Sequence, residues 1–384
     1  MKDFNFKIPQ NIQFGMGSLK KLPEILAENH SDNILLVSDR GLEKIGVVKK
    51  VQDIIEAAGL KCTSYLDVVP NPTVAVVNEA TALYKECGAT SIVALGGGSS
   101  MDVGKAVGVL VNYGGKITDY EGNHKVPGPI VPMIAIPTTA GTGSEVTASA
   151  VITDTERNYK LSVFSYEILP KYAVLDPELI MTAPASIAAS CGVDALIHAM
   201  EAYTSIHATP LTDMWAEHAI ALIAPNLRKA WARGEDIQAR QAMLTGSFYA
   251  GVAFCNAGVT AVHAFAYPIG ARYHIPHGLA NTLMLLPVFR FNMVGNMERF
   301  ARLAAMLGEN TTGLSHEKAA GRCLDALESL ARDLQVPRHL ADYGVTPDDV
   351  PVLAESVLQV TRLLGNNPRS VSLQDAINIY REAL

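Results

Sequence analysis

The stretch SIVALGGGSSMDVGKAVGVL, residues 91–110, decides the fold of the first half of the chain. A short apolar run leads into three consecutive glycines, and Ser100–Leu110 then has the pattern of a helix with Asp102 in its first turn. Glycines let a backbone approach phosphates closely, and the free N–H groups at the start of a helix attract their charge. By itself the stretch fits a pyrophosphate-binding turn and an ordinary strand-to-helix turn equally well.

Two more apolar runs share this organisation. Asn33–Ser38 ends at Asp39, and Val131–Ile136 leads into the loop PTTAGTGSE, residues 137–145. Short buried strands that alternate with amphipathic segments predict βα units and a parallel sheet.

The second half of the chain differs in residue composition and in the spacing of its apolar residues. From about Pro184 the sequence is rich in Ala, Leu, Met and Glu with apolar positions at helical spacing, which predicts an all-helical domain. The segment Leu175–Ala189 contains Pro177 and Pro184 and is the expected boundary. We therefore expect an α/β domain over residues 1–182 and a helical domain over residues 183–384.

Composition narrows the class of protein. With 49% hydrophobic and 18% charged residues, the 384-residue chain has enough apolar sequence for two packed cores. The net charge of -7, with scattered Lys and Arg, argues against a nucleic-acid partner. The apolar stretch Ile130–Pro137 is too short for a membrane span, and the start of the chain lacks the core of a signal peptide. Five irregularly spaced cysteines indicate reduced thiols, so we expect a cytoplasmic protein.

The loops after the three strands suggest a dinucleotide cleft. Asp39 could accept hydrogen bonds from a ribose and would repel a 2′-phosphate, which favours NAD over NADP. The alternative is that Asp39 only caps the next turn. The hydroxyls and glycines of residues 137–145 could donate to a phosphate or an amide. Because three such loops at the ends of neighbouring strands would line one crevice, the cleft is the better interpretation.

Residues that could ligate a metal occur in the second half. Asp194 and His198 lie four positions apart on one face of an expected helix. His263 lies on another expected helix, interrupted near Pro268, and His277 lies in the turn IPHG. A single histidine is more often a core or surface residue, but these lie in apolar or glycine-rich sequence, where uncompensated polar groups are costly. One carboxylate with up to three imidazoles suits Fe²⁺ or Zn²⁺ better than Mg²⁺.

These motifs resemble the iron-containing (group III) alcohol dehydrogenase family. The pattern FGMG at Phe14–Gly17 and the NNPR at Asn366–Arg369 extend the resemblance over almost the entire chain. The motifs that carry it are GGGSSMDVGK (96–105), PTTAGTGSE (137–145), GVDALIHAMEAY (192–203), AVHAFAYPIG (261–270) and IPHG (275–278).

The resemblance implies a Rossmann-like N-terminal domain and a helical C-terminal domain, with the active site and its catalytic metal between them. The implied metal ligands are Asp194, His198, His263 and His277. The implied nucleotide contacts are Asp39, Gly97, Gly98, Ser99, Thr138, Thr139 and Ser144. Asp102, in the first turn of the helix expected after the glycines, is a further candidate contact.

The candidate catalytic residues are Tyr267, His274 and Lys160. Many family members have a histidine where this chain has Tyr267, which puts a proton relay at that position in doubt. His274 is the alternative relay, unless it only hydrogen-bonds the cofactor or the backbone. Lys160 resembles a lysine near the family's cleft.

The expected function is hydride transfer between NAD(H) and a small primary alcohol or aldehyde, with Fe²⁺ or, alternatively, Zn²⁺ as the metal. The chain resembles the branch of 4-hydroxybutyrate dehydrogenases and hydroxyacid–oxoacid transhydrogenases, so an ω-hydroxy acid is a candidate substrate. Arg272 or His274 is the candidate partner of its carboxylate, and the alternative for Arg272, slightly favoured, is a surface or interface residue. The alternatives are a transhydrogenase, a dehydroquinate-synthase-like lyase and a non-catalytic nucleotide sensor. A homodimer or higher homo-oligomer is expected.

Overall fold

Six short strands of the first half form one parallel sheet, in the order β1-β9-β6-β4-β2-β3. The three predicted strands occupy its centre, and their residues are almost all buried because both faces of the sheet are covered. The strands are β1 (Asn11–Phe14), β2 (Asn33–Val37), β3 (Lys61–Tyr65), β4 (Ser91–Gly96), β6 (Met133–Pro137) and β9 (Tyr172–Leu175).

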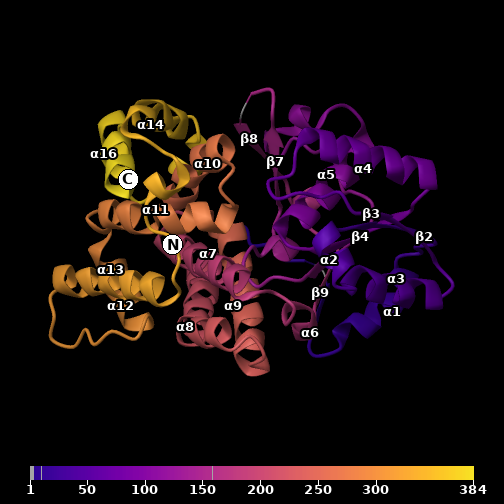
Figure 1. The fold of residues 1–384 in the computed structure, drawn as a ribbon, viewed down its shortest axis with the longest axis horizontal. Coiled ribbons are helices and arrows are strands. Elements are labelled where there is room, and N and C mark those ends of the chain that lie inside the picture. Colours follow the sequence, from indigo (N-terminus) through magenta and orange to yellow (C-terminus); the bar gives the residue numbers. More distant parts are fainter. Residues whose placement is uncertain (1–3, 10, 158) are drawn as a thin grey trace. The chain divides into compact units, whose positions relative to one another are not determined.

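The computed structural model describes residues 4–9, 11–157 and 159–384, which divide into two units. One unit is Lys7–Ala183, and the other is Pro184–Leu384 together with residues 4–6. Figure 1 shows the first unit in indigo to magenta and the helical unit mainly in orange and yellow.

Alternate side chains of the central strands enter two separate cores. Leu35 and Ile92 pack with α4 and α5, whereas Leu36 and Val93 pack with α1 and α3. Figure 1 shows these two pairs of helices on opposite faces of the sheet. This two-sided burial is what makes the strands continuous apolar runs. The helices of this unit are α1 (Leu22–Glu28), α2 (Arg40–Lys44), α3 (Val47–Ala57), α4 (Val74–Cys87), α5 (Gly98–Tyr113) and α6 (Pro177–Ile180), with 3₁₀ turns η1 (Ser18–Lys21), η2 (Ile117–Tyr120), η3 (Ser144–Val146) and η4 (Tyr166–Ile168).

A second, three-stranded sheet was not predicted from the sequence. It consists of β5 (Gly122–Asn123), β8 (Tyr159–Phe164) and β7 (Ser149–Asp154), and β7 pairs with β8 in antiparallel register. Every second residue of β7 is buried, as in a strand with one covered face.

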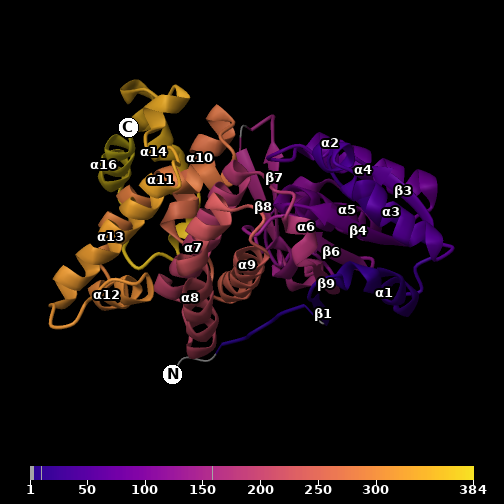
Figure 2. The same cartoon turned by 60° about the horizontal axis from the view of Figure 1, so that its bottom comes forward.

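The second unit is helical, as predicted from the composition and the spacing of apolar residues in this half of the chain. Helices α7, α8 and α9 lie side by side, as do α12 and α13 (Figure 2). The helices are α7 (Ala185–Thr204), α8 (Pro210–Ala232), α9 (Ile237–Ala257), α10 (Ala261–Tyr273), α11 (His277–Met293), α12 (Met297–Met306), α13 (His316–Asp333), α14 (Val350–Leu358), α15 (Thr361–Leu364) and α16 (Leu373–Ala383), with 3₁₀ turns η5 (Leu340–Tyr343) and η6 (Pro347–Asp349).

The predicted interruption near Pro268 is wrong, because α10 continues through it to Tyr273. A proline inside a helix removes one backbone hydrogen bond, but it does not end a helix that tertiary packing holds. Most of α10 up to Gly270 is buried, which supplies that packing. Pro225 and Pro287 likewise lie inside helices, α8 and α11, that continue past them.

Within the described residues, no single helix is long and apolar enough to cross a membrane, and α9 with α10 would qualify only as a pair bent by 100°. All five cysteines are free thiols.

Candidate metal centre and nucleotide-binding loops

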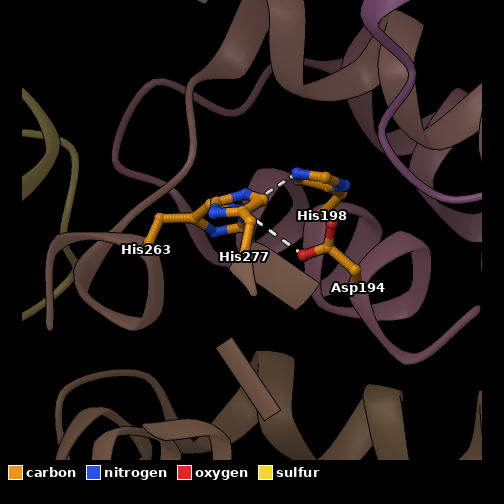
Figure 3. A group of neighbouring side chains, drawn as sticks. All are labelled: Asp194, His198, His263 and His277. Carbon is orange, nitrogen blue, oxygen red and sulfur yellow. Dashed lines mark hydrogen bonds and ion pairs between the residues drawn. The ribbon is translucent and has the colours of Figure 1, made fainter. Parts of the chain in front are cut away.

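Four side chains of the helical unit point toward one another (Figure 3). They are Asp194, His198, His263 and His277, and their potential ligand atoms all lie within 4.8 Å of one another. Asp194, His198 and His263 are buried, whereas His277 is partly exposed. The structure thus brings together the four residues that the resemblance implies as metal ligands.

The positions of these side chains follow from the local sequence. Asp194 and His198 lie on successive turns of α7, and His263 lies in the first turn of α10. His277 is the first residue of α11, where Pro276 precedes it. Gly278 allows this close packing, because a Cβ atom there would lie 2.8 Å from the carbonyl oxygen of Ser190 on α7.

The electrostatics of the cluster favour a cation. The Nε2 atoms of His263 and His198 are 2.9 Å apart, and His263 Nε2 is 3.7 Å from Asp194 Oδ1. Burial by itself would raise the pKa of Asp194, but the three neighbouring histidines and the hydrogen bond from Asn281 together outweigh it and bring the pKa below its ordinary value. One carboxylate and three imidazoles match the ligands that Fe²⁺ and Zn²⁺ prefer.

Asn281, which the sequence analysis missed, lies inside the cluster. Its Nδ2 atom is 2.7 Å from Asp194 Oδ1, 3.0 Å from His263 Nε2 and 3.2 Å from His277 Nε2. Its Oδ1 atom has no hydrogen-bond partner among the residues that the structure describes. The Asn281 amide therefore lies where the potential ligand atoms of three of the four residues converge. Asn281 follows His277 by four residues on α11, and this spacing could have placed both side chains on one face of the helix from the sequence alone.

Glu201 was also missed. It follows His198 by three residues on α7, is fully buried, and its carboxylate contacts Nδ1 of His263.

The predicted nucleotide-binding loops lie at the carboxyl ends of β2, β4 and β6, which are neighbours in the sheet. Asp39 Oδ1 accepts from Leu42 N at 3.0 Å and caps α2, so the capping role considered as the alternative is present. Gly97 and Gly98 form the start of α5, followed by Ser99. Gly96 has φ +149°, and a Cβ atom there would lie 2.5 Å from Ser100 Oγ, so this turn requires glycine.

The loop after β6 begins with Thr138 and Thr139. Thr138 is buried, and its backbone N–H donates to the carbonyl oxygen of Gly96 at 2.9 Å. The buried Thr139 Oγ1 has no hydrogen-bond partner within the described part of the chain, which leaves its hydroxyl able to serve a ligand.

Asp102 and Ser144, both predicted to contact the cofactor, are hydrogen-bonded to each other at 2.8 Å. Asp102 also accepts from Val151 N at 2.9 Å. The buried Lys105 Nζ donates to Ser144 Oγ at 2.9 Å and to the carbonyl oxygens of Ser144 and Ser149 at 2.7 and 2.8 Å. This cluster joins α5, η3 and β7.

The three candidate catalytic residues have different surroundings. The ring centroid of the buried Tyr267 lies 6.4 Å from that of His277. His274 is exposed at the end of α10 with φ +55°. Lys160 is buried on β8, and its Nζ donates to Asn71 Oδ1 at 2.7 Å. Arg272, the proposed partner of a substrate carboxylate, is exposed and forms an ion pair with Asp349 at 3.3 Å.

Both units match models of one known protein family. Residues 9–177 match the family described as iron-containing alcohol dehydrogenase, and residues 188–384 match the C-terminal part of the same family. The chain belongs to the iron-containing alcohol dehydrogenase family. The predicted family and enzyme class are therefore confirmed.

Characterised relatives align over the full chain. The NAD-dependent methanol dehydrogenase of Bacillus methanolicus is 40% identical and covers 99% of this chain and 100% of its own length. The 1,3-propanediol dehydrogenase of Klebsiella pneumoniae is 39% identical, with 99% of this chain and 98% of the relative covered. A crystal structure of a 1,3-propanediol oxidoreductase superposes with a TM-score of 0.97 at 39% identity and 100% coverage of both chains.

Proposed function

We propose that this chain transfers a hydride between NAD(H) and a small, uncharged primary alcohol or aldehyde. One divalent metal ion would be held by Asp194, His198, His263 and His277. The observation that carries the proposal is the convergence of these four side chains from three helices within 4.8 Å.

The side chains present fit such an ion. Bound there, Fe²⁺ or Zn²⁺ would act as a Lewis acid that lowers the pKa of an alcohol or polarises an aldehyde. Asp194 supplies one negative charge and the three imidazoles supply none when neutral, so the protein neutralises only part of the charge of a divalent ion. The partial exposure of His277 leaves that side of the cluster within reach of solvent.

The glycine turn before α5 and the hydroxyls of Thr138 and Thr139 support a dinucleotide at the carboxyl edge of the sheet. The name of the methanol dehydrogenase relative specifies NAD, and Asp39 favours NAD over NADP. Gly97, Gly98 and Ser99 are proposed to surround the pyrophosphate. Asp102 and Ser144 are proposed to support this loop through their mutual hydrogen bond.

Two observations favour an uncharged substrate over an ω-hydroxy acid. The methanol and 1,3-propanediol dehydrogenases, at 40% and 39% identity, are named for alcohols that carry no charge. Arg272 is already paired with Asp349 at the surface. A relay through His274 and roles for Tyr267 and Lys160 stay predictions, as do the cytoplasmic location and the homodimer.

A substrate panel tests this proposal. Metal-stripped protein is reloaded with Fe²⁺ or Zn²⁺, and butyraldehyde and succinic semialdehyde are compared with NADH and NADPH. We expect metal-dependent oxidation of NADH, higher kcat/KM for butyraldehyde, and the same substrate ratio in Arg272→Ala. A tenfold preference for the acid, about 1.4 kcal/mol in transition-state binding, would contradict the substrate assignment. Hydride exchange between substrates without added NADH would indicate a transhydrogenase.

A further inference from the structure

A fifth residue beside the four-residue cluster has a distinct set of contacts. Glu201 on α7 is fully buried. Its Oε1 atom accepts from Thr260 Oγ1 at 2.6 Å and from Val262 N at 2.8 Å. Its Oε2 atom is hydrogen-bonded to Nδ1 of His263. All three partners belong to the segment that begins α10.

These contacts determine which nitrogen of His263 carries the proton. The amide of Val262 can only donate, and an ionised carboxylate can only accept. Nδ1 of His263 must therefore carry its proton toward Glu201. In the neutral ring the lone pair is then on Nε2, the atom that lies 2.9 Å from His198 Nε2 and 3.0 Å from Asn281 Nδ2.

We propose that Glu201 is a positioning residue that prepares His263 to ligate the metal ion. It fixes the tautomer with the lone pair on Nε2, and through Thr260 and Val262 it holds the first turn of α10 in the register that aims the ring. A carboxylate behind a ligating imidazole also makes the imidazole a stronger donor. The inference rests on the proposed metal site.

Glu201→Gln separates this role from simple packing, because the two side chains have nearly the same shape. The fixed N–H of Val262 requires the amide oxygen of the glutamine on its side, which turns the NH₂ group toward Nδ1 of His263. That NH₂ group can only donate, so Nδ1 has to accept and the ring proton moves to Nε2. A protonated Nε2 cannot ligate a metal ion.

The test is the dissociation constant for Zn²⁺, measured by chelator competition on the purified metal-free full chain. We expect Glu201→Gln to bind Zn²⁺ at least about 10-fold more weakly than wild type, and up to about 100-fold. The visible spectrum of the Co²⁺-loaded variant should differ from that of wild type, since one ligand is lost or replaced.

Tyr380→Phe is the matched control. The buried hydroxyl of Tyr380 donates to the carbonyl oxygen of Phe265 on the same helix at 2.9 Å. Its removal deletes a hydrogen bond of α10 without touching the cluster, so wild-type Zn²⁺ affinity is expected. If both variants lose affinity equally, or if Glu201→Gln keeps wild-type affinity, the positioning role is overturned.

Should Glu201→Gln fail to fold, Thr260→Val decides the question, because it removes only the hydroxyl that donates to Oε1. A severalfold weaker Zn²⁺ affinity supports the role, and an unchanged affinity overturns it. Asp194→Ala tests the metal site separately from the role of Glu201. If this variant binds Zn²⁺ as tightly as wild type, the metal site itself is misplaced; if it does not, a negative result at Glu201 refutes only the positioning role.

Discussion

Two clusters of polar side chains, one in each unit, are built on different principles. In the α/β unit, Lys105 Nζ lies among the oxygens of Ser144, Thr147 and Ser149. Asp102 accepts from the hydroxyl of Ser144 and the amide of Val151. Each donor named here has an acceptor within the protein, so these polar groups are satisfied without a ligand.

In the helical unit, atoms that can each present a lone pair converge on one point. His263 Nε2 lies 2.9 Å from His198 Nε2 and 3.7 Å from Asp194 Oδ1, and the amide nitrogen of Asn281 lies within 3.2 Å of Asp194 Oδ1, His263 Nε2 and His277 Nε2. A metal ion can satisfy several such lone pairs at once. The balance of donors and acceptors therefore distinguishes a structural cluster from a ligand site, whereas residue types alone do not.

The largest expected effect is that of His277→Ala on catalysis. Removing one of four ligands should lower kcat/KM by at least about 100-fold with saturating metal. Metal-free wild type and variant should melt at nearly the same temperature, because His277 is only partly buried. Steady-state kinetics and thermal unfolding check both parts. Retention of most of the activity would show that the cluster is not the reaction site.

Lys105→Met should lower the stability of the fold but leave the affinity for the metal ion unchanged, in contrast to His277→Ala. The variant leaves the carbonyl oxygens of Ser144 and Ser149 without this donor, at a cost of about 3 kcal/mol. Urea unfolding measures the loss, and Zn²⁺ titration should give wild-type affinity. A variant as stable as wild type would mean that this cluster contributes little to the fold.

Glu145→Gln should affect neither catalysis nor metal binding, and its effect should be visible in the pH dependence of stability. Burial raises the pKa of Glu145 to about 7, and its backbone hydrogen bond and Lys105 only partly oppose this. Because the folded state holds the proton more tightly than the unfolded state, the stability contribution is full below the ordinary pKa and is lost as pH rises through about 7.

The melting temperature of wild type should therefore fall relative to that of Glu145→Gln between about pH 5 and pH 8. Thermal scans of both proteins across this range check the difference. Parallel curves would show that Lys105 already compensates Glu145 fully.

Local patterns carried most of what the sequence predicted correctly. The central strands are apolar runs that lead into Asp39, Gly97 or the loop after Pro137, and the helical half has apolar residues at helical spacing. Asp194 and His198 are separated by one helical turn, a spacing visible without a structure. The β7–β8 pair was missed because one face of each strand is less buried, which makes the apolar pattern discontinuous.

The remaining features depend on contacts between distant segments. Glu201 meets Thr260 and His263 across 59 and 62 residues of sequence, and no local pattern indicates that pairing. Asp102 and Ser144 have the composition expected of a phosphate-binding loop, but the structure pairs them across 42 residues. Short polar side chains near glycines fit both roles equally, so only the fold shows where their hydrogen bonds go.

The most direct test of the metal site is the number of metal ions bound per chain. Metal-free wild type, Asp194→Ala and Lys105→Met are dialysed against Zn²⁺, or against Fe²⁺ without oxygen, and metal and protein are quantified. We expect one tightly bound ion per chain in wild type and Lys105→Met, and none in Asp194→Ala, because Asp194 supplies the only carboxylate among the four candidate ligands. A full equivalent bound to Asp194→Ala with wild-type affinity, or no ion bound to wild type, would contradict the account.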